Sequence, residues 1–141
     1  MSEVFKVIVS GGRDFENYAY LKESLDKILA DIKEPIVIVS GGANGADMLG
    51  ERYARSKGYE IERHPAQWEL FGRGAGNRRN AEMGISVKEN GRGMLVAFWD
   101  MKSKGTSNMI DIAERYNIPY RVIEYWGEYN YGQAVFNLWE L

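Results

Sequence analysis

The chain has 141 residues, of which 45% are hydrophobic and 13% aromatic, which is enough for one domain with a sizeable core and too little for two ordinary ones. The sequence contains no cysteine and a single histidine, so disulfides, thiolate nucleophiles, thiolate metal sites and histidine-rich metal sites are excluded. The net charge of -2 disfavours polyanionic partners unless a local basic patch binds them. We therefore expect one domain over residues 1–141 and regard nucleic acid as an unlikely partner.

The hydrophobic runs are short. None approaches the roughly 20 apolar residues that a membrane-spanning helix requires, and the first residues lack the basic region and long apolar stretch of a signal peptide. We expect no membrane association and a cytoplasmic location.

The first half of the chain predicts two repeats of strand, glycine-rich loop and helix. Residues 4–9 form a β-branched run that stops at a Gly-Gly pair, and apolar residues at helical spacing follow from Tyr18 to Ile32. A second apolar strand over 36–39 leads into another Gly-Gly pair and then a helix that ends near Lys57-Gly58. A short strand over 59–63 completes this half.

The second half is less regular at first. The stretch 65–76 carries no clear periodicity, whereas 77–88 favours a helix. Residues 94–99 predict a strong strand, which a third loop and helix follow, and 120–124 predict a last strand. Residues 125–141 form an aromatic-rich C-terminal extension that we expect to cover the core or a second subunit, which makes a homodimer possible.

Alternation of strands and helices predicts the fold class. Strands joined by helices pair in parallel through right-handed crossovers, with helices on both faces of the sheet. Apolar runs without alternation are typical of strands buried on both sides. We therefore predict an α/β, Rossmann-like three-layer sandwich with a mostly parallel central sheet, in which the glycine-rich loops gather at the carboxyl ends of the strands.

The three loops are candidate anion sites. Glycine permits close approach of the backbone to a ligand, and the helix that follows presents N–H groups with partial positive charge. The loops lack the spacing of the dinucleotide fingerprint and the Lys-Ser or Lys-Thr of a P-loop, which disfavours a standard NAD or ATPase site.

Four blocks together carry a family resemblance. They are Ser10-Gly11-Gly12-Arg13-Asp14-Phe15, Ser40-Gly41-Gly42-Ala43-Asn44-Gly45-Ala46-Asp47, Gly76-Asn77-Arg78-Arg79-Asn80-Ala81-Glu82-Met83, and Ala97-Phe98-Trp99-Asp100 with Ser103-Lys104-Gly105-Thr106. In this order they resemble the YspA-type branch of the SLOG superfamily over about residues 4–124. That superfamily is similar in fold to the phosphoribohydrolases, the molybdenum-cofactor carrier proteins and the core of the DNA-processing protein A. The resemblance implies a Rossmann-like fold that senses or processes nucleotide-derived ligands.

The blocks supply the candidate ligand-binding residues. Glycine backbone and Thr106 would contact phosphate or ribose, arginine would neutralise phosphate, and carboxylates would accept hydrogen bonds from ribose hydroxyls or else cap helices. The set is Gly11, Gly12, Arg13, Asp14, Ser40, Gly41, Gly42, Ala43, Gly45, Asp47, Arg78, Asn80, Lys104, Gly105 and Thr106. No cofactor or metal is predicted beyond a nucleotide-type small molecule such as a nucleotide-sugar or an ADP-ribose-like compound.

Three functions remain open. Binding of the nucleotide-type ligand as a sensor or carrier is the first, and an N-glycosidic hydrolase of phosphoribohydrolase type is the second. In the related hydrolases a glutamate follows the Gly-Thr pair, but here Asn108 stands near that place and cannot act as a base. The catalytic residues are therefore unknown, with Asp47, Glu82 and Asp100 as candidates, so the sequence does not establish an enzyme. Single-stranded nucleic-acid binding, which would need a basic groove with stacking aromatics, is the third.

A few other side chains invite a functional interpretation. Arg73, Arg78 and Arg79 form the one clear local basic patch, for which solvated helix charge is the less favoured alternative explanation. His64 is more typical of a hydrogen-bonded structural residue than of a general base. Trp68 and Trp99 lie near loop ends, where they would pack in the core or stack on a base.

Overall fold

The computed structural model describes residues 3–132 and 134–135. Its elements are, in chain order, β1 (Phe5–Gly11), α1 (Tyr18–Leu29), β2 (Ile36–Ser40), α2 (Ala46–Lys57), β3 (Glu60–Arg63), α3 (Trp68–Phe71), the 3₁₀ helix η1 (Gly72–Gly74), α4 (Ala75–Asn90), β4 (Gly93–Trp99), α5 (Lys104–Arg115), β5 (Tyr120–Glu124) and β6 (Ala134–Val135). None of the helices in these described residues is both long and apolar enough to cross a membrane.

The strands form one sheet in the order β3-β2-β1-β4-β5-β6. The first five are parallel, and β6 adds an antiparallel edge by pairing with Val122 and Ile123 of β5. The fold is therefore the predicted α/β, Rossmann-like sandwich with a mostly parallel sheet. The chain leaves β1 toward β2 on one side and returns through β4 on the other, so the strand order reverses between β1 and β4, which is where such sheets bind ligands.

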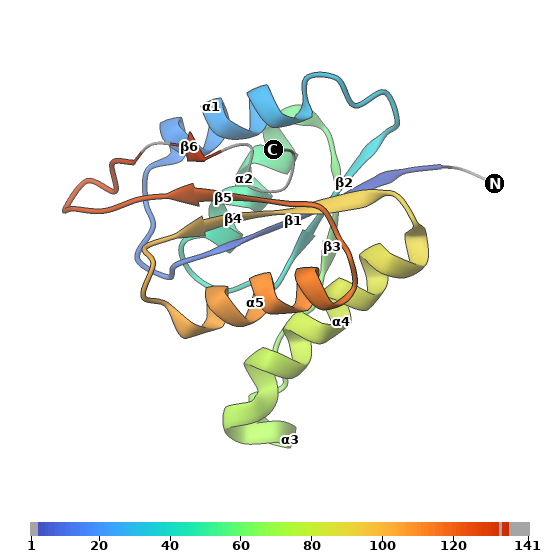
Figure 1. Ribbon diagram of the computed structural model, residues 1–141, viewed down its shortest axis with the longest axis vertical. Coiled ribbons are helices and arrows are strands. Elements are labelled where there is room, and N and C mark those ends of the chain that lie inside the picture. Colours follow the sequence, from blue (N-terminus) through green and yellow to red (C-terminus); the bar gives the residue numbers. More distant parts are fainter. Residues whose placement is uncertain (1–2, 133, 136–141) are drawn as a thin grey trace.

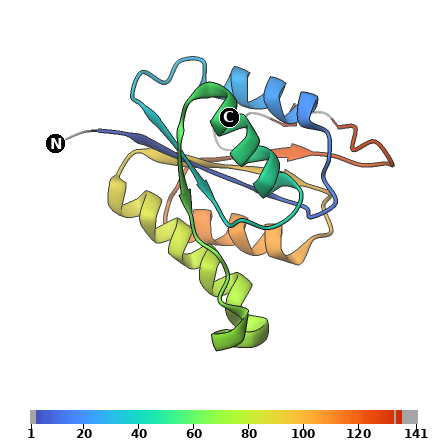
Figure 2. The same cartoon turned by 180° about the vertical axis from the view of Figure 1, so that it is seen from behind.

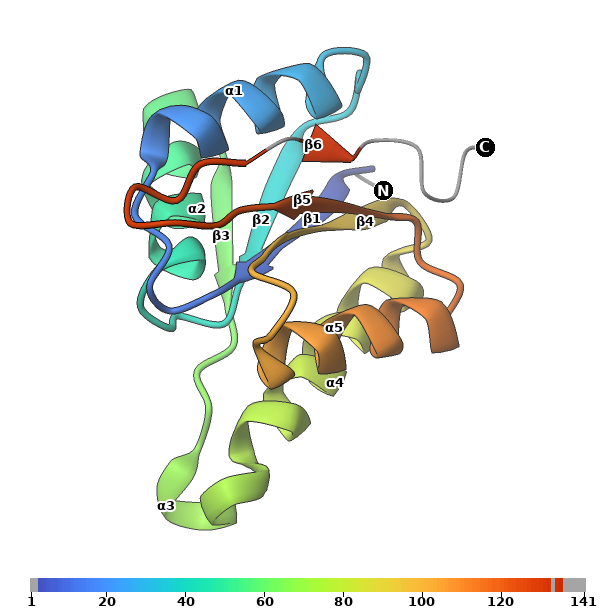
Figure 3. The same ribbon diagram turned by 60° about the vertical axis from the view of Figure 1, so that its left-hand side comes forward.

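Helices cover both faces of the sheet (Figure 3). Successive residues of β1 point to opposite faces: Val7 and Val9 pack in the core with α1 and α2, while Ile8 packs in the core with α4 and α5. All three side chains are fully buried. This double burial explains why the strands read as continuous apolar runs.

The boundaries differ most from the sequence prediction at the end of α1 and around residues 65–76. Helix α1 ends at Leu29, three residues before Ile32, because the chain turns there with the Ile32 N–H bonded to the Leu29 carbonyl. The irregular stretch 65–76 contains α3 and η1, and α4 begins two residues earlier than predicted. Residues 64–74, which we call the arm, project away from the sheet (Figures 1 and 2).

The C-terminal extension is partly described. Tyr125 is buried against the core, and Trp126 forms a bridge with Tyr131. The predicted covering roles of Phe136 and Trp139 fall outside the described residues.

Candidate functional site

The carboxyl ends of the parallel strands, on the left in Figure 1, surround a hollow of about 440 Å³. It lies between the loops after β1, β2 and β4, the first turns of α4 and α5, and the arm. Its lining comprises Ser10, Gly11, Gly12, Arg13, Asp14, Ala43, Asp47, Trp68, Arg73, Gly76, Asn77, Arg79, Asn80, Asp100, Ser103, Gly105 and Thr106. We call it the main hollow.

A second hollow of about 280 Å³ adjoins the first. The two share four residues, Arg13, Ala43, Trp68 and Arg79, and the second adds Gly41, Gly42, Asn44, Pro65 and Ala66. The guanidinium of Arg13 lies 5.9 Å from the centre of the Trp68 ring, which is half exposed. Two arginines and one tryptophan therefore line both hollows.

Arg79 binds the glycine-rich loop that follows β2. It is buried on the face of α4 that also carries Met83 and Val87, and its Nη1 donates to the Gly41 carbonyl at 2.6 Å. Its Nε donates to the amide oxygen of Asn80 at 3.1 Å. A buried charged group needs such hydrogen-bond partners. The guanidinium of Arg79 also places a positive charge in the lining of both hollows.

Asp47 faces the same place from the first turn of α2. Its side chain is buried, and its Oδ2 accepts a hydrogen bond from the Ala43 N–H at 3.3 Å. A Cβ on Gly41 would lie 2.5 Å from Arg79 Nη1 and 2.8 Å from Asp47 Oδ2, so this glycine fits between the two charged groups. Burial raises the pKa of Asp47 to about 6, against the lowering effects of the Ala43 N–H and of Arg79.

A second carboxylate on α2 supports the same loop. Glu51, one turn after Asp47, is fully buried, accepts from Ser40 Oγ at 2.6 Å, and pairs with Arg63. Ser40 Oγ in turn accepts from the Gly42 N–H at 3.0 Å. Ser40 therefore stabilises the loop through its side chain. It does not belong to the lining of either hollow.

Two helices begin at the main hollow without a side-chain cap. The N-cap positions are Gly45 for α2 and Ser103 for α5, and neither makes a side-chain cap hydrogen bond. Their first-turn N–H groups carry partial positive charge toward the hollow. The Asn80 amide bonds to the Gly105 carbonyl at 3.2 Å and to Asn108 at 3.0 Å, which joins α4 to the start of α5.

Several other sequence candidates also line the hollows. The main hollow takes Gly11, Gly12, Arg13, Asp14, Ala43, Asp47, Asn80, Asp100, Gly105 and Thr106, and the second hollow takes Gly41 and Gly42. Asp100 also braces its own loop, since its Oδ1 accepts from the N–H groups of Lys102 and Ser103 at 2.9 and 2.8 Å.

The remaining candidates lie elsewhere. Arg78 stacks on Phe71 with its guanidinium 4.0 Å from the ring centre, and Lys104 and Gly45 are outside both linings. Glu82 is half exposed and lies 3.6 Å from His64 in a separate surface depression. His64 also contacts Glu62 at 2.6 Å, in keeping with a structural histidine. Within the described part of the chain no group of three His, Cys, Asp or Glu residues could hold a metal ion.

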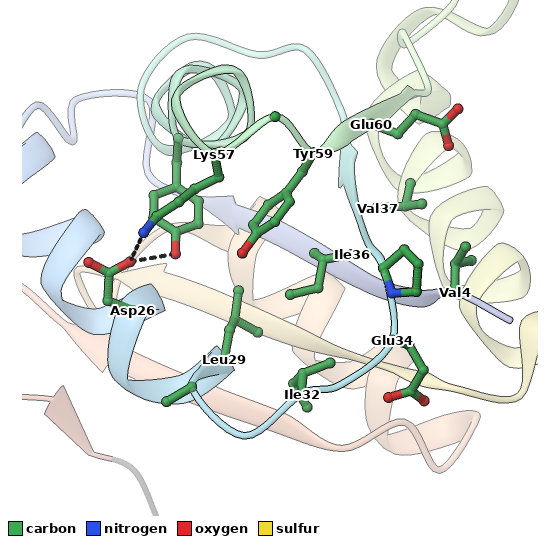
Figure 4. A pocket seen from close by; sticks show the side chains of 14 residues that line it. Val4, Asp26, Leu29, Ile32, Glu34, Ile36, Val37, Lys57, Tyr59 and Glu60 are labelled. Carbon is green, nitrogen blue, oxygen red and sulfur yellow. Dashed lines mark hydrogen bonds and ion pairs between the residues drawn. The ribbon is translucent and has the colours of Figure 1, made fainter.

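A larger hollow, about 670 Å³, lies at the opposite, amino end of the strands (Figure 4). Leu29, Ile32 and Ile36 give it an apolar side, and Asp26 bonds there to Tyr53 and Lys57. The C-terminal ends of α1 and α2 adjoin it, where exposed carbonyls disfavour anions. Its size alone does not make it a phosphate site.

Comparison with known proteins supports the family resemblance that the four sequence blocks carry. The sequence model of the YspA, cpYpsA-related SLOG family matches residues 5–71. The chain is 32% identical over 119 residues to the Gene 61 protein of Mycobacterium phage D29, with 81% of this chain and 92% of the phage protein covered. The chain belongs to the YspA, cpYpsA-related SLOG family. In this SLOG protein the family match includes the loops after β1 and β2, whereas the start of α5 and Tyr125 lie beyond it.

Proposed function

We propose that this SLOG protein binds a nucleotide or nucleotide-derived molecule, with the ligand's phosphate held in the main hollow. The observation that carries the proposal is the meeting of three glycine-bearing segments with Arg13 and Arg79 at the carboxyl edge of the sheet. Membership of the SLOG family fits a nucleotide-related ligand. Binding as a sensor or carrier requires no further chemistry.

The charges of the hollow suit a phosphate. Arg79 provides a buried guanidinium and Arg13 an exposed one. One guanidinium can donate two parallel hydrogen bonds to two oxygens of a phosphate. The first turns of α2 and α5 add backbone N–H donors. These groups favour an anion more strongly than the mixed lining of the amino-end hollow does.

The adjoining second hollow favours a ligand with a group beyond its phosphate, such as a nucleotide-sugar or an ADP-ribose-like compound. Arg13 and Arg79 line both hollows, so a phosphate or diphosphate beside them would leave a substituent on either side. Trp68 offers its exposed ring to a base at the same boundary.

Asp47 favours a second candidate function, hydrolysis of a nucleotide N-glycosidic bond. A carboxylate whose pKa lies near 6 is mostly ionised at pH 7 and can take a proton from water. That water would attack the anomeric carbon, the bond from this carbon to the base nitrogen would break, and the proton taken up by Asp47 would pass to the departing base. Release of free base that stops in Asp47→Asn would establish this function, whereas an intact ligand would exclude it.

The binding proposal is tested at Gly105, whose Cβ position has no atom within 4 Å. Gly105→Glu places a carboxylate beside the phosphate, and Gly105→Gln adds the same bulk without charge. We expect Gly105→Glu to weaken nucleoside diphosphate binding at least about tenfold more than Gly105→Gln does, measured by isothermal titration calorimetry. Equal affinities in the two variants, or wild-type protein that binds none of the common nucleotides, would contradict the proposal.

A further inference from the structure

Asp14 is the exposed carboxylate of the main hollow. The other two carboxylates in the lining, Asp47 and Asp100, accept hydrogen bonds from backbone N–H groups of their own loops. The exposed side chain of Asp14 lines the main hollow together with Arg13 and Arg79. An ionised carboxylate accepts hydrogen bonds and repels phosphate oxygens. A phosphate-bearing ligand that fits here must therefore turn a hydroxyl or amino donor toward Asp14.

Asp14 is held in place from a distant part of the chain. Tyr125, directly after β5, donates its hydroxyl hydrogen to Asp14 Oδ1 at 2.6 Å across a separation of 111 residues. The tyrosine is 2% exposed, and its ring packs on Phe15 with centroids 4.7 Å apart. Burial raises the pKa of Tyr125 well above its usual value, so the hydroxyl stays protonated and remains a donor.

The first glycine loop is shaped around this contact. A Cβ on Gly12 would lie 1.7 Å from the Tyr125 hydroxyl and 2.9 Å from Asp14 Oδ1, so only glycine leaves room for the pair. A second contact fixes the same loop, because the Glu16 N–H donates to the amide oxygen of Asn130 at 2.6 Å. The segment after β5 thus sets the geometry of the loop after β1.

We propose that Tyr125 is a positioning residue that orients Asp14 to accept a hydrogen bond from a ribose hydroxyl of the ligand, so that the site selects ribonucleotides over deoxyribonucleotides. This inference rests on the proposed function. The Tyr125 hydroxyl bonds to Oδ1, which restrains the carboxylate and leaves Oδ2 of this exposed side chain for the ligand. A hydroxyl bonded to a charged, preoriented acceptor discriminates well against the ligand that lacks it.

The test measures a ratio of affinities. The four common ribonucleoside diphosphates and their 2′-deoxy and 3′-deoxy counterparts are titrated into the wild-type protein, Tyr125→Phe and Asp14→Asn. We expect wild type to bind the best ribonucleotide at least about tenfold more tightly than one of its deoxy forms, and both variants to reduce that ratio to about threefold or less. Loss of packing alone would weaken both ligands equally and leave the ratio unchanged.

Tyr53→Phe is the matched control. Tyr53 is also buried and donates to an aspartate, Asp26 Oδ1 at 2.7 Å, but at the amino end of the sheet. We expect it to keep the full ratio. If Tyr125→Phe fails to fold, Asp14→Asn, an exposed substitution, still tests whether the ribose preference depends on the Asp14 carboxylate.

The outcomes separate the two proposals. Nucleotide binding without a ribose preference, or a preference that survives Asp14→Asn, overturns the inference and leaves the proposed function standing. A preference abolished by Asp14→Asn and retained in folded Tyr125→Phe overturns the positioning role. Failure to bind any nucleotide overturns the proposed function and the inference with it.

Discussion

The two ends of the sheet carry the same pair of side chains in different surroundings. At the carboxyl end, Tyr125 donates to Asp14, whose carboxylate lines a hollow with three arginines. At the amino end, Tyr53 donates to Asp26, which also contacts Lys22 at 3.0 Å and Lys57 at 3.1 Å. The second carboxylate is neutralised by its own protein, whereas the first remains available to a ligand. An accessible carboxylate, and not the larger volume, therefore distinguishes the end at which we propose binding.

The largest expected effect contrasts the two caps of α2. Gly45, at the start, has φ +81° and Gly58, at the end, has φ +74°. A Cβ would lie 2.2 Å from the Gly12 carbonyl oxygen at Gly45 but meets nothing within 4 Å at Gly58. We expect Gly58→Ala to cost about 1 to 2 kcal/mol of unfolding free energy through backbone strain alone. Gly45→Ala should cost about 3 kcal/mol or more, and urea unfolding would show equal losses if the close approach does not matter.

The next contrast uses neighbouring arginines of α4. Arg79→Met removes the donor to the Gly41 carbonyl and a cation that lowers the pKa of Asp47, and we expect a loss of about 2 kcal/mol in stability. Phosphate-ligand affinity should fall at least about a hundredfold. Arg78→Met removes only the contact with Phe71 and should change both quantities little. Chemical denaturation and calorimetry measure them, and a ligand effect at Arg78 equal to that at Arg79 would place the phosphate elsewhere.

Two aspartates should respond to pH with opposite signs. Burial raises the pKa of Asp47 to about 6, so its protonated form is favoured in the folded state, and its contribution to stability is lost as pH rises from about 4 to 6. The hydrogen bond from Tyr53, with Lys22 and Lys57, lowers the pKa of Asp26 to about 2, so its contribution is lost as pH falls from about 4 to 2.

Unfolding of Asp47→Asn and Asp26→Asn across pH 2 to 7 tests this contrast. Relative to its Asn variant, wild type should lose on the order of 2 kcal/mol at Asp47 between pH 4 and 6. At Asp26 the change should be smaller because solvent reaches that side chain. A flat difference at Asp47 would mean that the carboxylate is better solvated than its burial indicates.

The smallest effect is expected at the amino end. Lys57→Met removes an ion pair whose partners are each about a third exposed, and it should change stability by less than about 0.5 kcal/mol. Nucleotide affinity should stay at the wild-type value in calorimetry. A clear loss of nucleotide affinity in Lys57→Met would contradict the contrast between the two ends.

Much of this architecture was predictable because its signals are local. Apolar runs followed by glycine pairs predict strands, loops and their common edge without knowledge of distant contacts. The predicted ligand-binding set contains Arg78 and not Arg79. Helical periodicity places Arg79 on the buried face of α4, four residues before Met83 and eight before Val87. Tyr125 could not be found this way, since its partner Asp14 lies 111 residues away and no local pattern links them.

The arm can accept sequence changes without disturbing the hydrophobic core. Neither α3 nor η1 contains a buried residue, yet Trp68 and Arg73 of the arm line the main hollow. If the proposed ligand binds in the main hollow, substitutions in the arm change the residues that it meets and leave the core intact. Grafting arms from related proteins onto this sheet is then a way to change ligand preference at little cost to stability.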